Sequence, residues 1–209
     1  MKKILLVSAF ALCAFSAQAQ NPVKGDYGYL YCHMSDRGEY TAYALSRDGY
    51  HYEDIIGGNA VIDPKVHARI EGGQRDAYIT RAWNGKGFVM VTTDMCNRKS
   101  RSWYNYGINL LKSDDLIHWT SKTFDFRKGN EIFCDPESPD VIADWSKINR
   151  VWAPQVFWDP DYEWANGDKG GYFIYYSMLN RPEEGYDRMY YSYADKSFTH
   201  LTQPQLLFD

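Results

Sequence analysis

Short segments rich in Tyr, Val, Ile and Phe, each bounded by Gly, Asn, Asp or Pro, follow one another along almost the whole chain after Pro22. Such segments are typical of β-strands separated by turns. No stretch of ten or more residues has apolar side chains at the 3.6-residue spacing of an amphipathic helix. The sequence therefore predicts a mostly β protein, with strands at residues 27–34, 40–46, 77–82, 87–93, 106–112, 155–158, 171–178 and 188–194.

A turn motif recurs among these predicted strands. Residues 44–52 resemble residues 111–119, and residues 195–201 form a looser copy. The histidines of the three copies stand at positions 51, 118 and 200, so they are 67 and 82 residues apart. Units of this length, with four short strands each, are typical of β-propeller blades that carry insertions. We expect these histidines to be turn residues at blade edges rather than catalytic groups.

The first nineteen residues have the features of a secretory signal peptide. The start is positively charged, residues 4–15 form an apolar run, and the small residues Ala17 and Ala19 precede a cleavage position before Gln20. The apolar run is too short for a stable membrane anchor, and no other segment of the sequence is suited to cross a membrane. We therefore expect a mature chain of about 190 residues that is secreted or periplasmic.

Charge and cysteine content narrow the classes of partner and metal site. A net charge of −4 provides no basic surface to replace the counterions of nucleic acid, so nucleic acid is not an expected partner. Cys32, Cys96 and Cys134 remain after cleavage, and their spacing matches no zinc site. An odd number allows at most one disulfide among them. We interpret them as small buried apolar residues rather than as a disulfide.

Three polar segments are interpreted as loops or turns. Residues 134–140 contain carboxylates of the kind that bind calcium, but their spacing matches no calcium loop, so we favour a solvated loop. Residues 159–162 and 166–171 have the composition of hairpin turns. None of the three segments has a catalytic pattern.

Residues 70–81 contain the first candidate functional motif. Gly72 and Gly73 precede Arg75 and Asp76, and a short apolar strand follows immediately. At the first residue of a blade's inner strand, Asp76 would point into the axial pit of a propeller, where Arg75 would keep it ionised as a general base. Alternatively, Asp76 bonds to nearby backbone amides beside a surface arginine. The spacing alone leaves both interpretations open.

Residues 150–159 contain the second candidate motif. Pro154 fits the first residue of a strand, where a missing N–H donor is tolerated. Trp152 would then present its indole face to a sugar ring, and Gln155 would bond to sugar hydroxyls. Alternatively, Trp152 packs within a blade. Both interpretations remain open from the sequence.

With these motifs the sequence resembles glycoside hydrolase family 43, the five-bladed β-propeller glycosidases that act on arabinofuranosides and xylosides. The resemblance rests on residues 73–79, 113–119 and 151–155. Family members commonly have an Arg-Asp-Pro start to the first blade, a Ser-x-Asp-Leu-x-x-Trp outer turn and a Trp-Ala-Pro start to the second blade. Ala77 departs from this pattern, because the family often has proline there, so the backbone restraint beside the base is absent.

The resemblance implies a fold, a mechanism and a set of site residues. The family uses a base Asp in the first blade, a pKa-tuning Asp in the third and an acid Glu in the fourth, with inversion at the anomeric carbon. Asp76 matches the base position, and Arg75, Trp152 and Gln155 are the candidate substrate-binding residues. The resemblance implies no required cofactor but permits a calcium ion in the axial channel. The substrate would be an oligo- or polysaccharide with arabinofuranose or xylose units.

The two other carboxylates have no candidate at a matching motif, so we expect them beyond residue 209. Residues 20–209 are then the N-terminal portion of an all-β, five-bladed propeller, with about two blades and a set of N-terminal closing strands. We expect such a chain to be inactive alone. Its oligomeric state leaves no signal in the sequence.

Three other functions remain open. A sialidase-like propeller hydrolase would have similar turns, although the tryptophan expected to close the turn is absent from the first copy. A secreted, non-catalytic glycan-binding propeller would use the same high aromatic content, 17% of all residues, for stacking on sugar rings. A scaffold propeller would instead bury Arg75 and Asp76 in an ion pair away from any pit.

Overall fold

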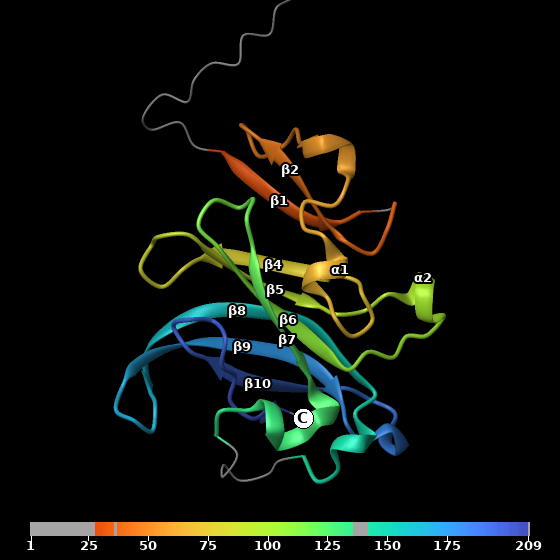
Figure 1. The fold of residues 1–209 in the computed structure, drawn as a ribbon, viewed down its shortest axis with the longest axis vertical. Coiled ribbons are helices and arrows are strands. Elements are labelled where there is room, and N and C mark those ends of the chain that lie inside the picture. The colour runs from red at the N-terminus through yellow and green to blue at the C-terminus, as the bar shows by residue number, and fades with distance from the viewer. Residues whose placement is uncertain (1–27, 36, 136–141, 209) are drawn as a thin grey trace, which may run out of the picture.

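A computed structural model describes residues 28–35, 37–135 and 142–208, which form three antiparallel sheets (Figure 1). The first sheet has the strand order β1-β2-β3, the second β4-β5-β6-β7 and the third β11-β10-β9-β8. The strands are β1 (Tyr29–Met34), β2 (Thr41–Ser46), β3 (Glu53–Asp54), β4 (Arg75–Arg81), β5 (Phe88–Thr93), β6 (Gly107–Ser113), β7 (Thr120–Asp125), β8 (Arg150–Glu163), β9 (Lys169–Leu179), β10 (Arg188–Ala194) and β11 (Gln205–Phe208). The predicted signal peptide, residues 1–19, lies outside the described residues.

Helical segments are short and lie in the connections. The α-helical turns are α1 (Pro64–His67) and α2 (Asn97–Ser100), and the 3₁₀ turns are Ile55–Gly58, Phe126–Ile132, Trp145–Lys147 and Pro182–Glu184. Within the described residues, no helix is long and apolar enough to cross a membrane. The all-β prediction is therefore confirmed.

All eight predicted strands are present, and the structure adds β3, β7 and β11. The sequence of β7, TSKTFD, has little apolar character, because this strand lies at the edge of its sheet and buries few side chains besides Phe124. Strand β11 is likewise an edge strand with mostly exposed side chains. Edge strands with one exposed face give a weak apolar pattern, which is why the sequence did not predict them.

Three predicted boundaries are wrong. Strand β4 begins at Arg75, so Asp76 is its second residue rather than its first. Strand β8 begins at Arg150, so Trp152 and Pro154 lie inside it. Residues 159–162, expected to form a hairpin turn, also belong to β8, where the register with β9 shifts between Asp159 and Glu163. The turn predicted at residues 166–171 connects β8 to β9, but residues 169–171 already belong to β9, so the prediction is confirmed only for residues 166–168.

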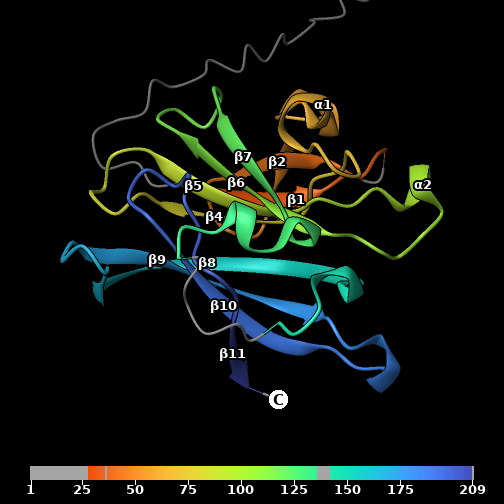
Figure 2. The ribbon, with the colours of Figure 1, turned by 60° about the horizontal axis from the view of Figure 1, so that its bottom comes forward.

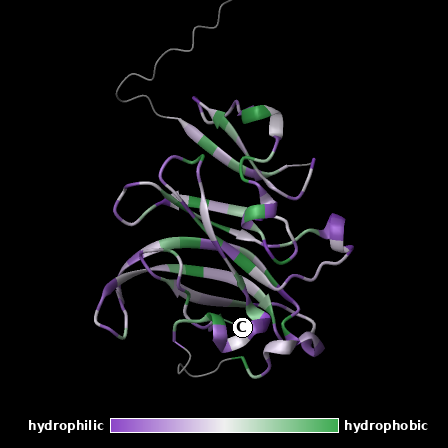
Figure 3. Ribbon diagram, viewed as in Figure 1, coloured by the Kyte–Doolittle hydropathy of each residue, from purple (hydrophilic) through white to green (hydrophobic). Residues whose placement is uncertain are grey.

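The three sheets are stacked face to face, which Figure 2 shows from a second direction. The larger core fills the space between the second and third sheets and includes Val89, Val91, Ile108, Leu110, Phe124, Val151, Val156, Ile174, Tyr176 and Tyr190. A smaller core lies between the first and second sheets and includes Tyr43, Met90, Leu111 and Trp119. Apolar residues accordingly follow the strands, whereas α2 is hydrophilic (Figure 3).

Strand β5 shows the consequence of burial on both faces. Val89 and Val91 pack toward the third sheet, Met90 packs toward the first, and all three are fully buried. The strand therefore lacks the alternation of apolar and polar residues found where one face is solvated. Because the second sheet is packed on both faces, the position of Thr93 at the end of β5 is well defined.

The three cysteines are free thiols. Cys32 and Cys96 are half-buried, and burial raises the pKa of the Cys32 thiol to about 12. Cys134 is exposed, so the expectation that all three are buried is wrong for this residue. It lies in the connection that follows the 3₁₀ turn ending at Ile132, outside the strands whose pattern suggested burial.

Candidate active site

The first motif forms a β-bulge at the start of β4. The register with β5 shifts between Arg75 and Tyr78, so Asp76 and Ala77 stand opposite a single residue of β5. Asp76 has a φ of 53°, in the left-handed region, which Asp adopts more readily than most residues. Bulges redirect side chains and are frequent next to active sites. The bulge at the start of β4 therefore sets the direction of the exposed Asp76 carboxylate.

The second motif forms a matching bulge in β8. The register with β9 shifts between Trp152 and Gln155, and Ala153 has a φ of 49°. Proline is tolerated inside a strand at a bulge, where the ladder of hydrogen bonds is already interrupted. This explains why Pro154 lies within β8 rather than at its first residue. Two neighbouring sheets thus have the same irregularity at the motif that the sequence analysis selected.

Thr93, the last residue of β5, connects the two bulges. Its hydroxyl donates a hydrogen bond to Asp76 Oδ2, with an oxygen–oxygen distance of 2.8 Å. The backbone N–H of Ala153 donates to the same hydroxyl oxygen at 2.9 Å. Thr93 is fully buried, whereas Asp76 is exposed. The exposed Asp76 carboxylate is therefore hydrogen-bonded to the buried Thr93 hydroxyl, which is also hydrogen-bonded to Ala153 of the neighbouring sheet.

Aromatic and cationic side chains lie beside the first bulge. The guanidinium of Arg75 lies 5.4 Å from the centre of the Trp103 ring and donates to Met95 Sδ at 3.7 Å. The Trp103 ring meets the Trp152 ring edge to face, with centroids 6.4 Å apart. Arg150 lies over the other tryptophan, with its guanidinium carbon 4.6 Å from the Trp152 ring centre. Cations over indole faces are stabilising contacts in protein structures.

The expected pairing of Arg75 with Asp76 is not present. Among the described residues, the salt bridges do not include an Arg75–Asp76 pair, and Arg75 contacts Trp103 and Met95 instead. The carboxylate partner is the hydroxyl of Thr93. In a regular strand, neighbouring residues such as Arg75 and Asp76 point to opposite faces. The bulge changes the direction of the Asp76 side chain, but it does not bring this side chain to Arg75. Adjacency in the sequence was therefore a poor guide to the partner of Asp76.

Trp103 is a site residue that the sequence analysis missed. It lies in the connection between α2 and β6, and 59% of its side chain is exposed. The buried Asn105 fixes this connection to β8, because its amide nitrogen donates to the Val151 carbonyl at 2.7 Å and its oxygen accepts from the Val151 N–H at 2.9 Å. The aromatic run at residues 103–106 was the available signal. An exposed indole held on a fixed loop is suited to stacking on a sugar ring.

Gln155 lies beyond the second bulge, and its side chain is bonded within the third sheet. Its Oε1 accepts a hydrogen bond from the Tyr175 hydroxyl at 2.5 Å. The side chain is exposed, and within the described part of the chain it makes no hydrogen bond to Asp76 or Trp152. The structure thus brings Arg75, Asp76 and Trp152 together through Trp103 and Thr93, but gives Gln155 a different partner.

The loop that leads into β4 is held by a buried carboxylate and by a close backbone contact. Asp94 is fully buried, and its oxygens accept hydrogen bonds from the N–H groups of residues 70–72 at 2.9–3.0 Å. Burial raises the pKa of Asp94, and these amides oppose that rise. Gly73 is required next to them, because a β-carbon there would lie 1.8 Å from the Met95 carbonyl oxygen.

The histidine-containing turns form as expected. Asp115 Oδ1 accepts from the N–H groups of Ile117 and His118, and its Oδ2 lies 2.7 Å from His118 Nδ1. Asp48 makes the same contacts with residues 50 and 51. These histidines are exposed and bond to the aspartate of their own turn. The prediction that they are turn residues is confirmed.

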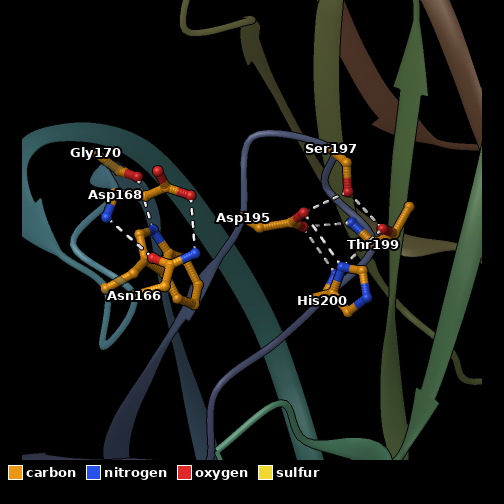
Figure 4. Close-up of polar contacts among 8 residues, drawn as sticks. Asn166, Asp168, Gly170, Asp195, Ser197, Thr199 and His200 are labelled. Atoms are coloured by element: carbon orange, nitrogen blue, oxygen red, sulfur yellow. Dashed lines mark hydrogen bonds and ion pairs between the residues drawn. The ribbon is translucent and has the colours of Figure 1, made fainter.

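The third copy of the turn borders a separate cavity, shown in Figure 4. Asp195 accepts hydrogen bonds from its own turn, including the N–H groups of Thr199 and His200. On the opposite wall, Asn166 and Asp168 bond to each other. The cavity has a volume of about 390 Å³ and is lined by Cys134, Trp164, Ala165, Asn166, Asp168, Gly170, Asp195, Lys196 and His200. Because these polar groups stabilise their own loops, we place the candidate active site at Asp76.

The calcium ion that the family resemblance permits has no cluster of acidic side chains to hold it in the described ranges. No group of three or more His, Cys, Asp or Glu side chains among those residues is arranged to hold a metal ion. Residues 136–140 of the acidic segment lie outside them.

The model of a family described as "Probable glycosyl hydrolase domain", related to glycoside hydrolase family 43, matches residues 25–209. An α-L-arabinofuranosidase from Bifidobacterium longum subsp. longum is 24% identical over 96 residues, which cover 43% of this chain and 8% of that protein.

Two solved structures of a fructofuranosidase from Schwanniomyces occidentalis have a similar fold. The complex with fructosyl-erythritol has a TM-score of 0.52 and 17% identity, over 86% of this chain and 29% of that chain. The complex with fructose has a TM-score of 0.50 and 16% identity, over 87% of this chain and 28% of that chain. The likeness extends to the propeller-like arrangement of sheets. The chain spans less than a third of the length of each of these relatives.

Proposed function

This chain belongs to the glycosyl hydrolase family related to family 43, and on that premise we propose that it is part of a secreted or periplasmic glycosidase that hydrolyses α-L-arabinofuranosides or β-xylosides, with Asp76 as general base. One observation supports this most strongly. Asp76 is an exposed carboxylate on a bulge of left-handed conformation, and a fully buried hydroxyl holds it in place. Backbone strain of this kind is concentrated at functional sites. The predicted signal peptide supports export.

The proposed reaction inverts the anomeric carbon. Asp76 Oδ2 accepts a hydrogen bond from Thr93, and we assign Oδ1 as the oxygen that would contact the attacking water. Oδ1 takes a proton from that water, whose oxygen forms a bond to the anomeric carbon. The glycosidic C–O bond breaks on the opposite face, and its electron pair stays with the leaving oxygen, which a carboxylic acid protonates. In inverting enzymes the two carboxyl groups are about 6.5–9.5 Å apart, which leaves room for the water.

We propose that the acid comes from a part of the protein other than residues 28–208. The matched solved chains are more than three times as long as the segment they share with this one, which supports a larger active site. The 209-residue chain by itself would then bind sugar weakly and lack turnover.

Substrate recognition would use the aromatic cluster beside Asp76. The exposed indole of Trp103 and the half-buried indole of Trp152 offer apolar faces to the C–H groups of a pentose ring. Arg75 is held over Trp103 and would donate to sugar hydroxyls from there. Gln155 would do so after exchanging its bond to Tyr175 for one to the substrate.

The test uses the complete gene product and the 209-residue chain side by side. Each is incubated with oligosaccharides of α-L-arabinofuranose or of β-D-xylose, whose leaving oxygens need a proton, and the first-formed sugar anomer is followed by ¹H NMR. We expect hydrolysis with inverted configuration by the complete product and no turnover by the 209-residue chain. Retained configuration would contradict the base role of Asp76, and turnover by the short chain would contradict the separate origin of the acid.

A non-catalytic glycan-binding protein is the second candidate. The exposed Trp103, held beside Trp152 and two arginines, favours it, because such a surface stacks on sugars without any acid. Oligosaccharide binding by the complete gene product, seen as a change in tryptophan fluorescence without release of sugar, would favour this function over hydrolysis.

A further inference from the structure

We propose that Thr93 is a positioning residue that fixes the direction of the Asp76 carboxylate and couples it to the bulge in the neighbouring sheet. The proposal rests on the proposed function of Asp76. Thr93 is not part of either sequence motif, and it lies at the end of β5, in the sheet between the other two.

The direction of both hydrogen bonds of Thr93 follows from the chemistry of their partners. The backbone N–H of Ala153 can only donate, so the Thr93 oxygen accepts at 2.9 Å. A hydroxyl has one hydrogen, and the Asp76 carboxylate oxygen at 2.8 Å is an acceptor when ionised. The chain of bonds therefore runs from Ala153 N–H to the Thr93 hydroxyl and on to Asp76 Oδ2. Reversal is excluded, because an amide N–H has no lone pair to offer.

This chain of bonds selects one orientation of the carboxylate. An exposed aspartate otherwise samples several side-chain rotamers, and ordering it costs conformational entropy. A hydrogen bond to an ionised acceptor is stronger than one between neutral groups, and here the donor is fully buried. Oδ2 thereby keeps one lone pair directed at the Thr93 hydroxyl, and we assign Oδ1 to the attacking water. A reacting group held in this way is pre-organised for its task.

The bulge at Ala153 gives independent support. Alanine has no polar side chain that could stabilise a positive φ locally, so its φ of 49° is held by its surroundings. That conformation directs its N–H toward Thr93, across the boundary between the second and third sheets. The bulges at Asp76 and Ala153 are therefore linked by hydrogen bonds to the same Thr93 hydroxyl.

If the role of Thr93 were purely structural, its hydroxyl would serve only to accept the hydrogen bond of the Ala153 N–H, and its loss would affect stability rather than kcat. Three variants separate the two roles. Thr93→Val removes the hydroxyl with little change in shape, and Thr93→Ser keeps it. Thr92→Val is the matched control, because Thr92 is equally buried and bonds to Asn109 rather than to Asp76. Should Thr93→Val not fold, Thr93→Ala replaces it.

Kinetics of the complete gene product measure the effect on catalysis. We expect Thr93→Val to lower kcat roughly 10- to 100-fold with KM nearly unchanged, since a small misplacement of a reacting group has effects of this size. Thr93→Ser and Thr92→Val should stay within about threefold of the wild type on the same grounds. In an Asp76→Asn background, Thr93→Val should have no further effect on kcat. An equal loss in both backgrounds, or an effect on KM alone, would overturn the proposal.

A second measurement does not depend on turnover. Three-bond NMR couplings of this chain report the χ1 rotamer of Asp76. We expect one rotamer in the wild type and in Thr93→Ser, and averaging in Thr93→Val. A single rotamer in Thr93→Val would overturn the positioning role even if Asp76 is the base. Full activity of Asp76→Asn would instead refute the proposed function and leave the rotamer result standing.

Discussion

At the scale of single residues, the partner of Asp76 is the least predictable feature of the site. The sequence places Arg75 next to Asp76, yet the carboxylate bonds to Thr93, and Arg75 lies over Trp103. Neighbouring residues of a strand point to opposite faces, and the bulge with its positive φ at Asp76 accompanies the contact of this carboxylate with Thr93. Motif comparison selects Asp76 as a candidate residue, whereas the backbone conformation decides which groups Asp76 contacts.

The aspartates of the repeated turns provide a prediction on pH dependence. The His118 ring and the backbone N–H groups of residues 117 and 118 hold the pKa of the Asp115 carboxyl well below its usual range. A pKa lowered on folding stabilises the fold above the unfolded value of about 4, and this contribution is lost as the pH falls below it. We expect Asp115→Asn to lower Tm at pH 7 but to reduce the loss of Tm on acidification.

Thermal unfolding followed by circular dichroism between pH 7 and pH 3 tests this expectation. Asp114→Asn is the control, since Asp114 is an exposed neighbour in the same turn. If Asp115→Asn and Asp114→Asn had the same Tm at every pH, the hydrogen bonds of Asp115 would make no net contribution to stability.

At the scale of elements, strands with apolar patterns were predictable and irregularities within them were not. Strand β10 was predicted with its observed bounds, because it is rich in tyrosine and lies between Asp187 and Asp195. Strand β8 was predicted as four residues but has fourteen, since two register shifts and Pro154 interrupt its pattern. Bulges depend on pairing with another strand, which the sequence of one strand does not encode.

The loop before β4 has room only for glycine at position 73. A β-carbon on residue 73 would lie 1.8 Å from the Met95 carbonyl oxygen, and backbone cannot move aside as a flexible side chain can. We expect Gly73→Ala to lower the free energy of unfolding by about 1–3 kcal/mol, the usual cost of overpacking. Gly28→Ala is the control, because its nearest contact would be at 3.6 Å. Urea unfolding measures both, and equal stability of the two variants would show that the loop can rearrange.

At the scale of the whole molecule, stacking of the sheets creates the site. Thr93 and Ala153 are 60 residues apart in sequence and meet only because the second and third sheets share one core. The same packing brings Trp103 to Trp152 through the contacts of Asn105 with β8. The sequence predicted Asp76, Arg75 and Trp152 as site residues from their motifs. Thr93 could not be found in this way, because its role depends on contacts between sheets, whereas the aromatic residues at 103–106 were a signal for Trp103 that the motifs did not include.

The catalytic role of Asp76 is the central claim, and one measurement tests it most directly. The kcat of the complete gene product is compared between the wild type and Asp76→Asn, with Asp114→Asn as a control at a carboxylate far from the bulge in sequence. Loss of a general base lowers the rate roughly 10²- to 10⁴-fold, so we predict a kcat reduced by that factor with KM little changed. A kcat for Asp76→Asn within threefold of the wild type, well short of roughly 10²-fold, would contradict the account.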